Sequence, residues 1–275
     1  MTAAPIASER VPGGAAPVLD ARELHKAFGG QVAVERVDLA VWPGERVALL
    51  GPNGAGKTTT LLMLLGAITP DRGTIEVVGH PVPAERTQAM EHVGFVAGYL
   101  PLPQHLTVRE ALAFFGRLYG VRRPLPAIDE ALERFRITDL ADQRSESLSS
   151  GQRTLVGICK AILHRPALVV LDEPTASLDP DVAYRVREGL RSLSIDDGTA
   201  LLVTSHNMVE VERLCERVVF VSKGRIVAEG SPDEVARSFS ATDLEGVFLE
   251  LAGTLLDGDR TVVSDPFIPD AEPLP

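Results

Sequence analysis

The stretch RVALLGPNGAGKTTT, residues 46–60, decides the fold that we expect for this chain. The mostly apolar run at 46–50 predicts a buried strand, and the pattern of 59–68 predicts a helix. Between them, GPNGAGKT matches the phosphate-binding pattern GxxxxGK followed by Ser or Thr, in the strand–loop–helix setting that this pattern requires. The alternative is a chance glycine-rich turn, and both flanks argue against it. We therefore expect a phosphate loop.

We expect three features to bind phosphate: the backbone N–H groups of the loop, Lys57, and the N-terminus of the helix that follows the loop. The glycines of the loop let N–H groups turn toward an anion, and the helix N-terminus adds about half a positive charge. Lys57 is expected to reach the β- and γ-phosphates, and the Thr58 hydroxyl to bind Mg²⁺. The predicted ATP-binding residues of this segment are Gly51, Pro52, Asn53, Gly54, Ala55, Gly56, Lys57, Thr58 and Thr59.

Strand patterns extend on both sides of this loop. Residues 18–28 and 31–41 alternate apolar and polar side chains around Gly29 and Gly30, which predicts an antiparallel hairpin. Strands that alternate with helices predict an α/β fold with a parallel sheet. Further strands are expected at 167–171, 200–204 and 217–221, and helices between them at about 181–193 and 207–215.

The middle of the chain has helical patterns instead. One helix is expected through Tyr119, and others at about 127–135 and 151–164, which we interpret as a helical insertion at about 100–165. Capping boxes, each a Ser or Thr followed three residues later by Glu, predict helix starts at Thr107, Ser231 and Thr242.

Two carboxylates follow a buried strand in LVVLDEP, residues 168–174. Asp172, at the carboxyl end of the strand, suits a Mg²⁺ partner, and Glu173 suits a base that polarises an attacking water. The alternative is a pair of solvated loop carboxylates. Five apolar strand residues directly before the pair favour the catalytic interpretation.

Composition limits the remaining classes of function. The net charge of −11 argues against a nucleic-acid binder, which usually has a basic face. We expect no signal peptide, because the N-terminal residues have no apolar run, and no membrane span, because the longest apolar runs are far shorter than the ~20 residues of a span. Cys159 and Cys215 are interpreted as reduced thiols, with a disulfide as the alternative. The residues at 1–17 and the acidic residues at 253–275 predict disordered ends.

Further motifs complete the pattern of a known family. LSSGQ at 148–152 resembles the signature of ABC ATPases, TASLD at 175–179 resembles their D-loop, and VTSHN holds His206 where they have a switch histidine. From residue 18 to 252, the chain resembles the ATP-binding subunit of ABC transporters. The resemblance implies a P-loop NTPase core with a parallel sheet, an N-terminal antiparallel β subdomain and an inserted α-helical subdomain.

The resemblance also implies roles in the chain's own ATP site. His206 would bond the γ-phosphate and hold the attacking water, beside Glu173 as the second catalytic residue. Phe28, in HKAFGG, would stack on adenine, and Val34 would support the same base.

Other motifs are implied to act on a second subunit. In the family, two subunits pack head to tail, and each signature helix caps the γ-phosphate held by the other subunit. A helix that starts near Gly151 would present backbone donors to that phosphate. The alternative for LSSGQ is an ordinary serine cap. The signature residues are Ser149, Ser150, Gly151 and Gln152, and the D-loop residue is Asp179.

One position departs from the family pattern. The family usually has a glutamine after the strand that VGFV at 93–96 matches, and aligning back from LTVRE places Gly98 there. Gln104 is near but out of register. In the family, that glutamine normally contacts Mg²⁺ and senses the membrane partner. We therefore infer either that another residue couples this chain to its membrane partner or that water completes the coordination of Mg²⁺.

The sequence thus predicts an ATP-hydrolysing subunit at the cytoplasmic face of a cell membrane, working with a separately encoded permease and a second ATP-binding subunit. The C-terminal region most resembles the ATPases of bacterial exporters. Two alternatives stay open: a soluble ABC ATPase that acts on nucleic acid or ribosomes, and an idle regulatory subunit. The acidic charge opposes the first, and intact Lys57 and Glu173 oppose the second.

Overall fold

The computed structural model describes residues 16–97, 102–176 and 178–256. Gly98 and most of the two predicted terminal segments lie outside these ranges. Within them, no helix is both long and apolar enough to cross a membrane.

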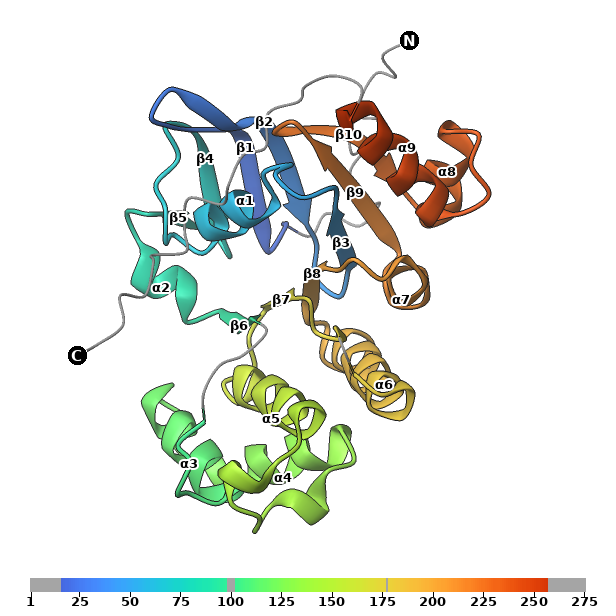
Figure 1. Cartoon of the computed structure of the whole chain (residues 1–275). Coiled ribbons are helices and arrows are strands. Elements are labelled where there is room, and N and C mark those ends of the chain that lie inside the picture. The colour runs from blue at the N-terminus through green and yellow to red at the C-terminus, as the bar shows by residue number, and fades with distance from the viewer. Residues whose placement is uncertain (1–15, 98–101, 177, 257–275) are drawn as a thin grey trace, which may run out of the picture.

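The described strands form one sheet in the order β5-β4-β1-β2-β10-β9-β3-β8-β7-β6. The segment from β9 to β6 is parallel, whereas β5, β4, β1 and β2 pair antiparallel and lie above it in Figure 1. This arrangement confirms the α/β class, the parallel sheet and the N-terminal hairpin. The strands are β1 Leu19–Phe28, β2 Gln31–Val41, β3 Arg46–Leu50, β4 Arg72–Val77, β5 His80–Val82, β6 Val93–Ala97, β7 Leu168–Asp172, β8 Ala200–Thr204, β9 Arg217–Ser222 and β10 Arg225–Gly230.

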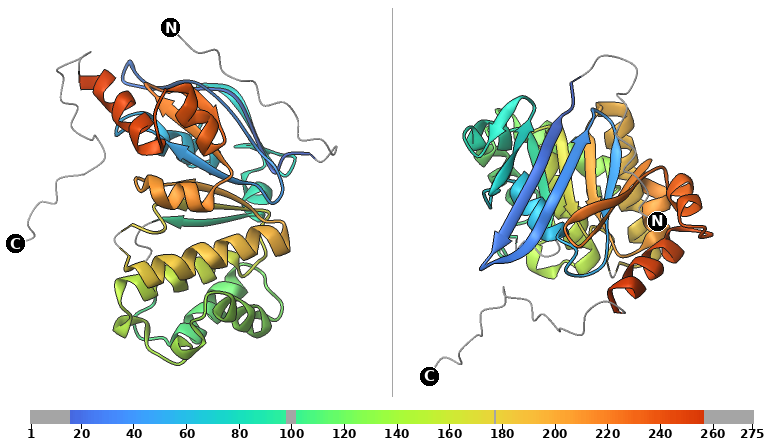
Figure 2. Two further views of the ribbon diagram at one scale, coloured as in Figure 1. Left: turned by 90° about the vertical axis from the view of Figure 1, so that its right-hand side faces the viewer. Right: turned by 90° about the horizontal axis from the view of Figure 1, so that it is seen from above.

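Helices α3, α4 and α5 gather at one end of the molecule, apart from the antiparallel strands (Figure 1; Figure 2, left). They correspond to the predicted helical insertion. The long helix α6 runs between this helical group and the rest of the molecule. The helices are α1 Lys57–Leu64, α2 Arg86–Met90, α3 Val108–Leu118, α4 Pro124–Arg134, α5 Ser150–Ile162, α6 Pro180–Asp197, α7 Met208–Leu214, α8 Pro232–Ser238 and α9 Leu244–Leu256.

Both faces of the parallel sheet are buried. Ala48 and Leu50 of β3 belong to one apolar cluster, and Val47 and Leu49 belong to the other. Alternate residues of a strand point to opposite faces, so β3 lies between two layers of core. A strand buried on both faces reads as a nearly continuous apolar run, which is why RVALL could be recognised.

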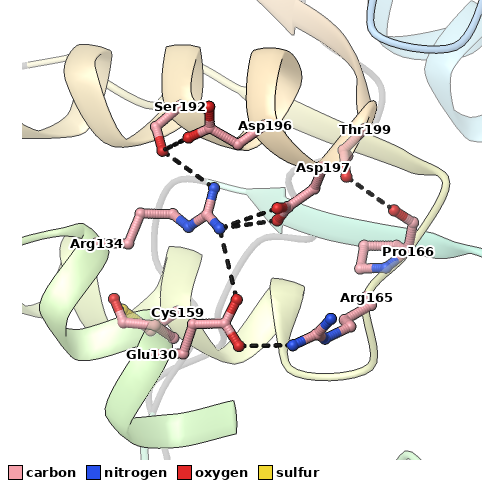
Figure 3. Close-up of polar contacts among 10 residues, drawn as sticks. Glu130, Arg134, Cys159, Arg165, Pro166, Ser192, Asp196, Asp197 and Thr199 are labelled. Carbon is pink, nitrogen blue, oxygen red and sulfur yellow. Dashed lines mark hydrogen bonds and ion pairs between the residues drawn. The ribbon is translucent and has the colours of Figure 1, made fainter.

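Side chains of α4 hold the helical insertion against α6. Arg134 donates to Ser192 and pairs with Asp197 at 2.9 Å, as Figure 3 shows. The Phe135 ring lies so close to Gly189 that a Cβ there would be 2.3 Å from a ring carbon. A cavity of about 530 Å³ beside this joint includes Thr199, before β8, and is distant from the phosphate loop at the other end of the strands.

The capping boxes at Thr107 and Ser231 are confirmed. The one at Thr242 is wrong, because Asp243 accepts from the Gly246 N–H at 2.9 Å and α9 begins at Leu244. A short carboxylate one position later therefore replaces the threonine as the cap.

The two cysteines are free and buried, which confirms the interpretation as thiols. Burial raises the pKa of Cys215 to about 12 and raises that of Cys159 as well. Arg46 near Cys215 favours the thiolate but is outweighed by burial, so both thiols are expected to be unreactive.

Candidate active site

The phosphate loop connects β3 to α1, as the sequence predicts. Gly56 precedes the helix with a φ of +101°, a conformation that side-chain-bearing residues rarely adopt. A Cβ on Gly51 would lie 2.1 Å from the Val221 carbonyl oxygen, and one on Gly56 would lie 2.5 Å from that of Ala33. Neighbouring backbone thus excludes side chains at both positions.

Lys57 points back into the loop. Its ammonium donates to the carbonyl oxygens of Gly51 at 2.6 Å and Pro52 at 3.0 Å. Burial lowers the pKa of Lys57, and the charges of Glu173 and Asp172 oppose that change. The Lys57 ammonium is partly removed from water and surrounded by the backbone of the loop. A cation in such a site attracts a polyanion such as a nucleotide phosphate strongly.

Asp172 and Glu173 stand at the carboxyl end of β7, beside the end of β8. The Thr204 hydroxyl donates to Asp172 Oδ1, and the Glu173 N–H donates to the Thr204 carbonyl at 3.1 Å. Glu173 has a φ of +54°, which is strained for a residue with a side chain. The backbone bond to Thr204 helps to hold this turn, and the turn aims the carboxylate at the next loop.

That loop carries His206. The ring Nε2 lies 3.3 Å from Glu173 Oε1, and the His206 N–H donates to Glu173 Oε2 at 3.2 Å. The histidine side chain is 52% exposed and the glutamate 26%. Both groups are therefore fixed relative to one another and still open to a ligand.

The signature segment caps α5. Ser149 accepts from the Gln152 N–H at 3.2 Å, and the Ser149 N–H donates to Gln152 Oε1 at 2.8 Å. Gly151 is buried, and a Cβ there would lie 3.2 Å from Val182 at the start of α6. This segment makes no hydrogen bond or ion pair with the phosphate loop in the part of the chain that the structure describes.

Comparisons with known proteins settle the family. A family model described as ABC transporter matches residues 34–176. A protein of Cupriavidus metallidurans named Nod factor export ATP-binding protein I is 40% identical over 233 residues, which cover 84% of this chain and 77% of that protein. This chain belongs to the ABC transporter family.

Two further matches agree with this membership. A Mesorhizobium japonicum protein of the same name is 41% identical, over 82% of this chain and 67% of its own length. A solved structure described as an ATP-binding subunit of an ABC transporter superposes with a TM-score of 0.77 at 28% identity, over 86% of this chain and 99% of that one. The chain is an ATP-binding subunit of an ABC transporter, and its family hydrolyses ATP.

Within this ABC subunit, the structure brings together most of the residues predicted to act on the ATP bound by the same chain. Lys57, Asp172, Glu173 and His206 meet near the carboxyl ends of adjacent strands β3, β7 and β8. Phe28 ends β1 with 42% of its surface exposed, beneath the Lys26 ammonium. The roles of these residues stay predictions.

Other predicted residues lie differently. Val34 is fully buried, and its side chain packs close to Gly56 of the phosphate loop. Asp179 precedes α6 and is exposed, with no side-chain cap bond. Thr58 is exposed on the first turn of α1, and Gln152 is occupied by its capping bond to Ser149.

Sequence reasoning missed two residues of the ABC site. Thr204 contacts both Asp172 and Glu173, and Asn207 caps α7 directly after His206 by accepting from the Glu210 N–H. The sequence contains a signal for each residue. Thr204 places a hydroxyl at the end of an inner strand, and Asn207 is an asparagine at an expected helix start. The contacts of Thr204 are with residues about 30 positions away in sequence, which the sequence alone does not reveal.

Proposed function

We propose that this ABC subunit uses ATP binding and hydrolysis to drive export through a separately encoded membrane subunit. The contact between Glu173 and His206, beside the phosphate loop, is the observation that carries the hydrolytic part. The names of the relatives, Nod factor export ATP-binding protein I, support export as the direction.

In the proposed reaction, Glu173 accepts a proton from the attacking water and His206 holds the γ-phosphate. The Glu173 carboxylate is partly exposed and bonded to His206, so it is oriented and accessible to water. Lys57 neutralises charge that develops on the phosphates. Phe28 presents an exposed aromatic face for adenine.

Mg²⁺ is part of the proposal. Thr58 and Asp172 would hold it, and when bound it would neutralise phosphate charge. A hydroxyl and a carboxylate are the oxygen donors that Mg²⁺ prefers, and this ion is often held by few protein groups together with substrate phosphates. Asp172 is partly exposed at the end of β7 and Thr58 is exposed on the first turn of α1, so both residues are open to a ligand.

A second ATP-binding subunit completes each proposed site, and two copies of this chain would suffice. Ser149 caps α5, and Ser150 and Gly151 begin it; the first N–H groups of this 13-residue helix suit a phosphate. These residues make no bonds to the chain's own phosphate loop among the described residues, which supports a role toward a partner. A two-fold dimer would then form two equivalent sites.

The membrane subunit is proposed to contact the outer side of α3 and the start of α4. Phe114, Leu118 and Leu125 are 53%, 67% and 52% exposed there. Arg122 and Arg123 lie between the two helices, exposed and without an ion pair to any residue that the structure describes. Aromatic side chains and arginines are enriched in protein interfaces, which favours a protein partner.

The test is recovery of partners of the tagged chain from its native membranes in mild detergent, followed by mass spectrometry. We expect a stoichiometric multi-span protein, and its loss in the Leu118→Ser variant. Leu249→Ser is the matched control, because Leu249 is 63% exposed on α9, away from this surface. Recovery of only soluble proteins or ribosomes would contradict the proposed function.

A further inference from the structure

One ion pair joins the helix that follows the D-loop to the helix that follows the switch histidine. Arg187, in α6, donates to Glu210 Oε2, in α7, at 2.6 Å. The two side chains are only 12% and 15% exposed. In Figures 1 and 2, α7 lies next to α6. Such a shielded pair is screened little by salt. Without Arg187, Glu210 would keep only the longer contact with the more exposed Arg213 of its own helix, at 3.8 Å.

Glu210 stands in the first turn of α7, four residues after His206. Its N–H donates to Asn207 Oδ1 at 3.2 Å, so backbone and side chain of Glu210 are held from two sides. The His206 N–H, one residue before that cap, donates to Glu173. A displacement of the first turn of α7 would therefore move His206 relative to Glu173.

Apolar contacts alone do not fix this turn as firmly. Met208, Val211 and Leu214 bury one face of α7 in the core, but non-directional contacts permit small shifts of a helix that short. At the far end, Arg46 bonds both Ser194 of α6 and the Leu214 carbonyl. At the His206 end, Arg187–Glu210 is the direct side-chain bond between the two helices in the described part of the chain.

We propose that Arg187 and Glu210 are positioning residues for ATP hydrolysis: their ion pair fixes the start of α7 and so holds His206 against Glu173. The proposal rests on the roles proposed above for Glu173 and His206. Because α6 begins next to Asp179 and Gly151, the pair also joins the segments that face a second subunit to the hydrolytic centre.

Arg187→Met tests the proposal, since methionine keeps a long unbranched apolar side chain and removes the guanidinium that pairs with Glu210 and lies over the Tyr184 ring. In the full-length chain, we expect kcat for ATP to fall about tenfold, with ATP affinity within about twofold of the wild type. Arg134→Met is the matched control, because Arg134 is also 12% exposed and also pairs with α6. Its partner Asp197 lies before β8, at the opposite end of that strand from His206. Arg134→Met should lower thermal stability similarly and leave kcat nearly unchanged.

A double variant separates positioning from general weakening. If Arg187 acts through His206, Arg187→Met should reduce single-turnover hydrolysis much less in a His206→Ala background than alone. Equal losses in both backgrounds, or an equal loss of kcat in Arg134→Met, would overturn the proposal. The single variants Glu173→Gln and His206→Ala test the proposed hydrolytic site separately from the ion pair. Wild-type turnover in either variant would refute the catalytic roles proposed for Glu173 and His206.

Discussion

Glu173 contacts His206 through both of its carboxylate oxygens, one toward the ring at 3.3 Å and one toward the backbone N–H at 3.2 Å. The two residues are 33 positions apart in sequence and come from the ends of adjacent strands β7 and β8. Because the loop that carries His206 orients the Glu173 carboxylate, a change in that loop should alter ATP hydrolysis.

Glu173→Gln should abolish hydrolysis and preserve ATP binding. The amide keeps the shape of the side chain but cannot accept the proton of the attacking water. We expect kcat to fall by about a hundredfold or more, measured as phosphate release, with an ATP dissociation constant near that of the wild type by calorimetry. Phosphate release at the wild-type rate would refute the role of Glu173 as base.

Lys57 should make ATP affinity sensitive to alkaline pH. Burial places its pKa below the 10.5 of a free lysine, so its positive charge is present at neutral pH and is lost as pH rises through the lowered value. We expect ATP affinity to decline as pH is raised from 7 toward 10. Lys57→Ala should bind at least about tenfold more weakly at pH 7, with a flatter pH profile. Identical profiles for both proteins would contradict the assignment.

The glycines of the phosphate loop should differ in their tolerance of alanine. A Cβ at Gly51 would meet the Val221 carbonyl at 2.1 Å, whereas a Cβ at Gly54 would have no atom within 4 Å. Gly54→Ala should cost only backbone strain, about 1 kcal/mol, because its φ is +76°. Gly51→Ala should cost about 3 kcal/mol or more, measured by denaturant unfolding. Equal losses would show that the loop packs differently against β9.

Both thiols should be unreactive in the folded chain. The pKa of Cys215, raised to about 12, leaves about one thiolate in ten thousand at pH 8, and Cys159 is more deeply buried still. A thiol reagent at pH 8 should therefore modify neither cysteine until denaturant is added, and then both. Rapid labelling of either in the native protein would indicate that its segment opens.

Much of the architecture was predictable because its signals are local. The phosphate loop, the Gly29–Gly30 hairpin and the capping box at Thr107 each depend on residues that are close together in sequence. The local signal failed at Thr242, where Asp243 offered a competing cap. The strand order was beyond this reasoning, since it depends on how distant segments pack.

The site divides in the same way. Lys57, Asp172 and Glu173 were predicted because each follows a recognisable strand, and His206 was predicted because VTSHN resembles a motif of the family. The bonds from Lys57 to Gly51 and Pro52, and the link from Arg187 to Glu210, need three-dimensional proximity that no spacing reveals. The role of Gly98 stays a prediction, because that residue lies outside the described ranges.

The most direct test of the account is the mass of the Glu173→Gln chain with and without ATP and Mg²⁺, measured by sedimentation. We expect a species of 29.4 kDa without ATP and a dimer of about twice that mass with it. Adding Ser150→Asp should prevent the dimer, because Ser150 is exposed on the first turn of α5 and a negative charge there would stand where phosphate is expected. Gly157→Asp, on the same helix with open space around it, should not prevent the dimer. A chain that stays monomeric at saturating ATP, or that dimerises equally with Ser150→Asp, would contradict a site completed by a second copy.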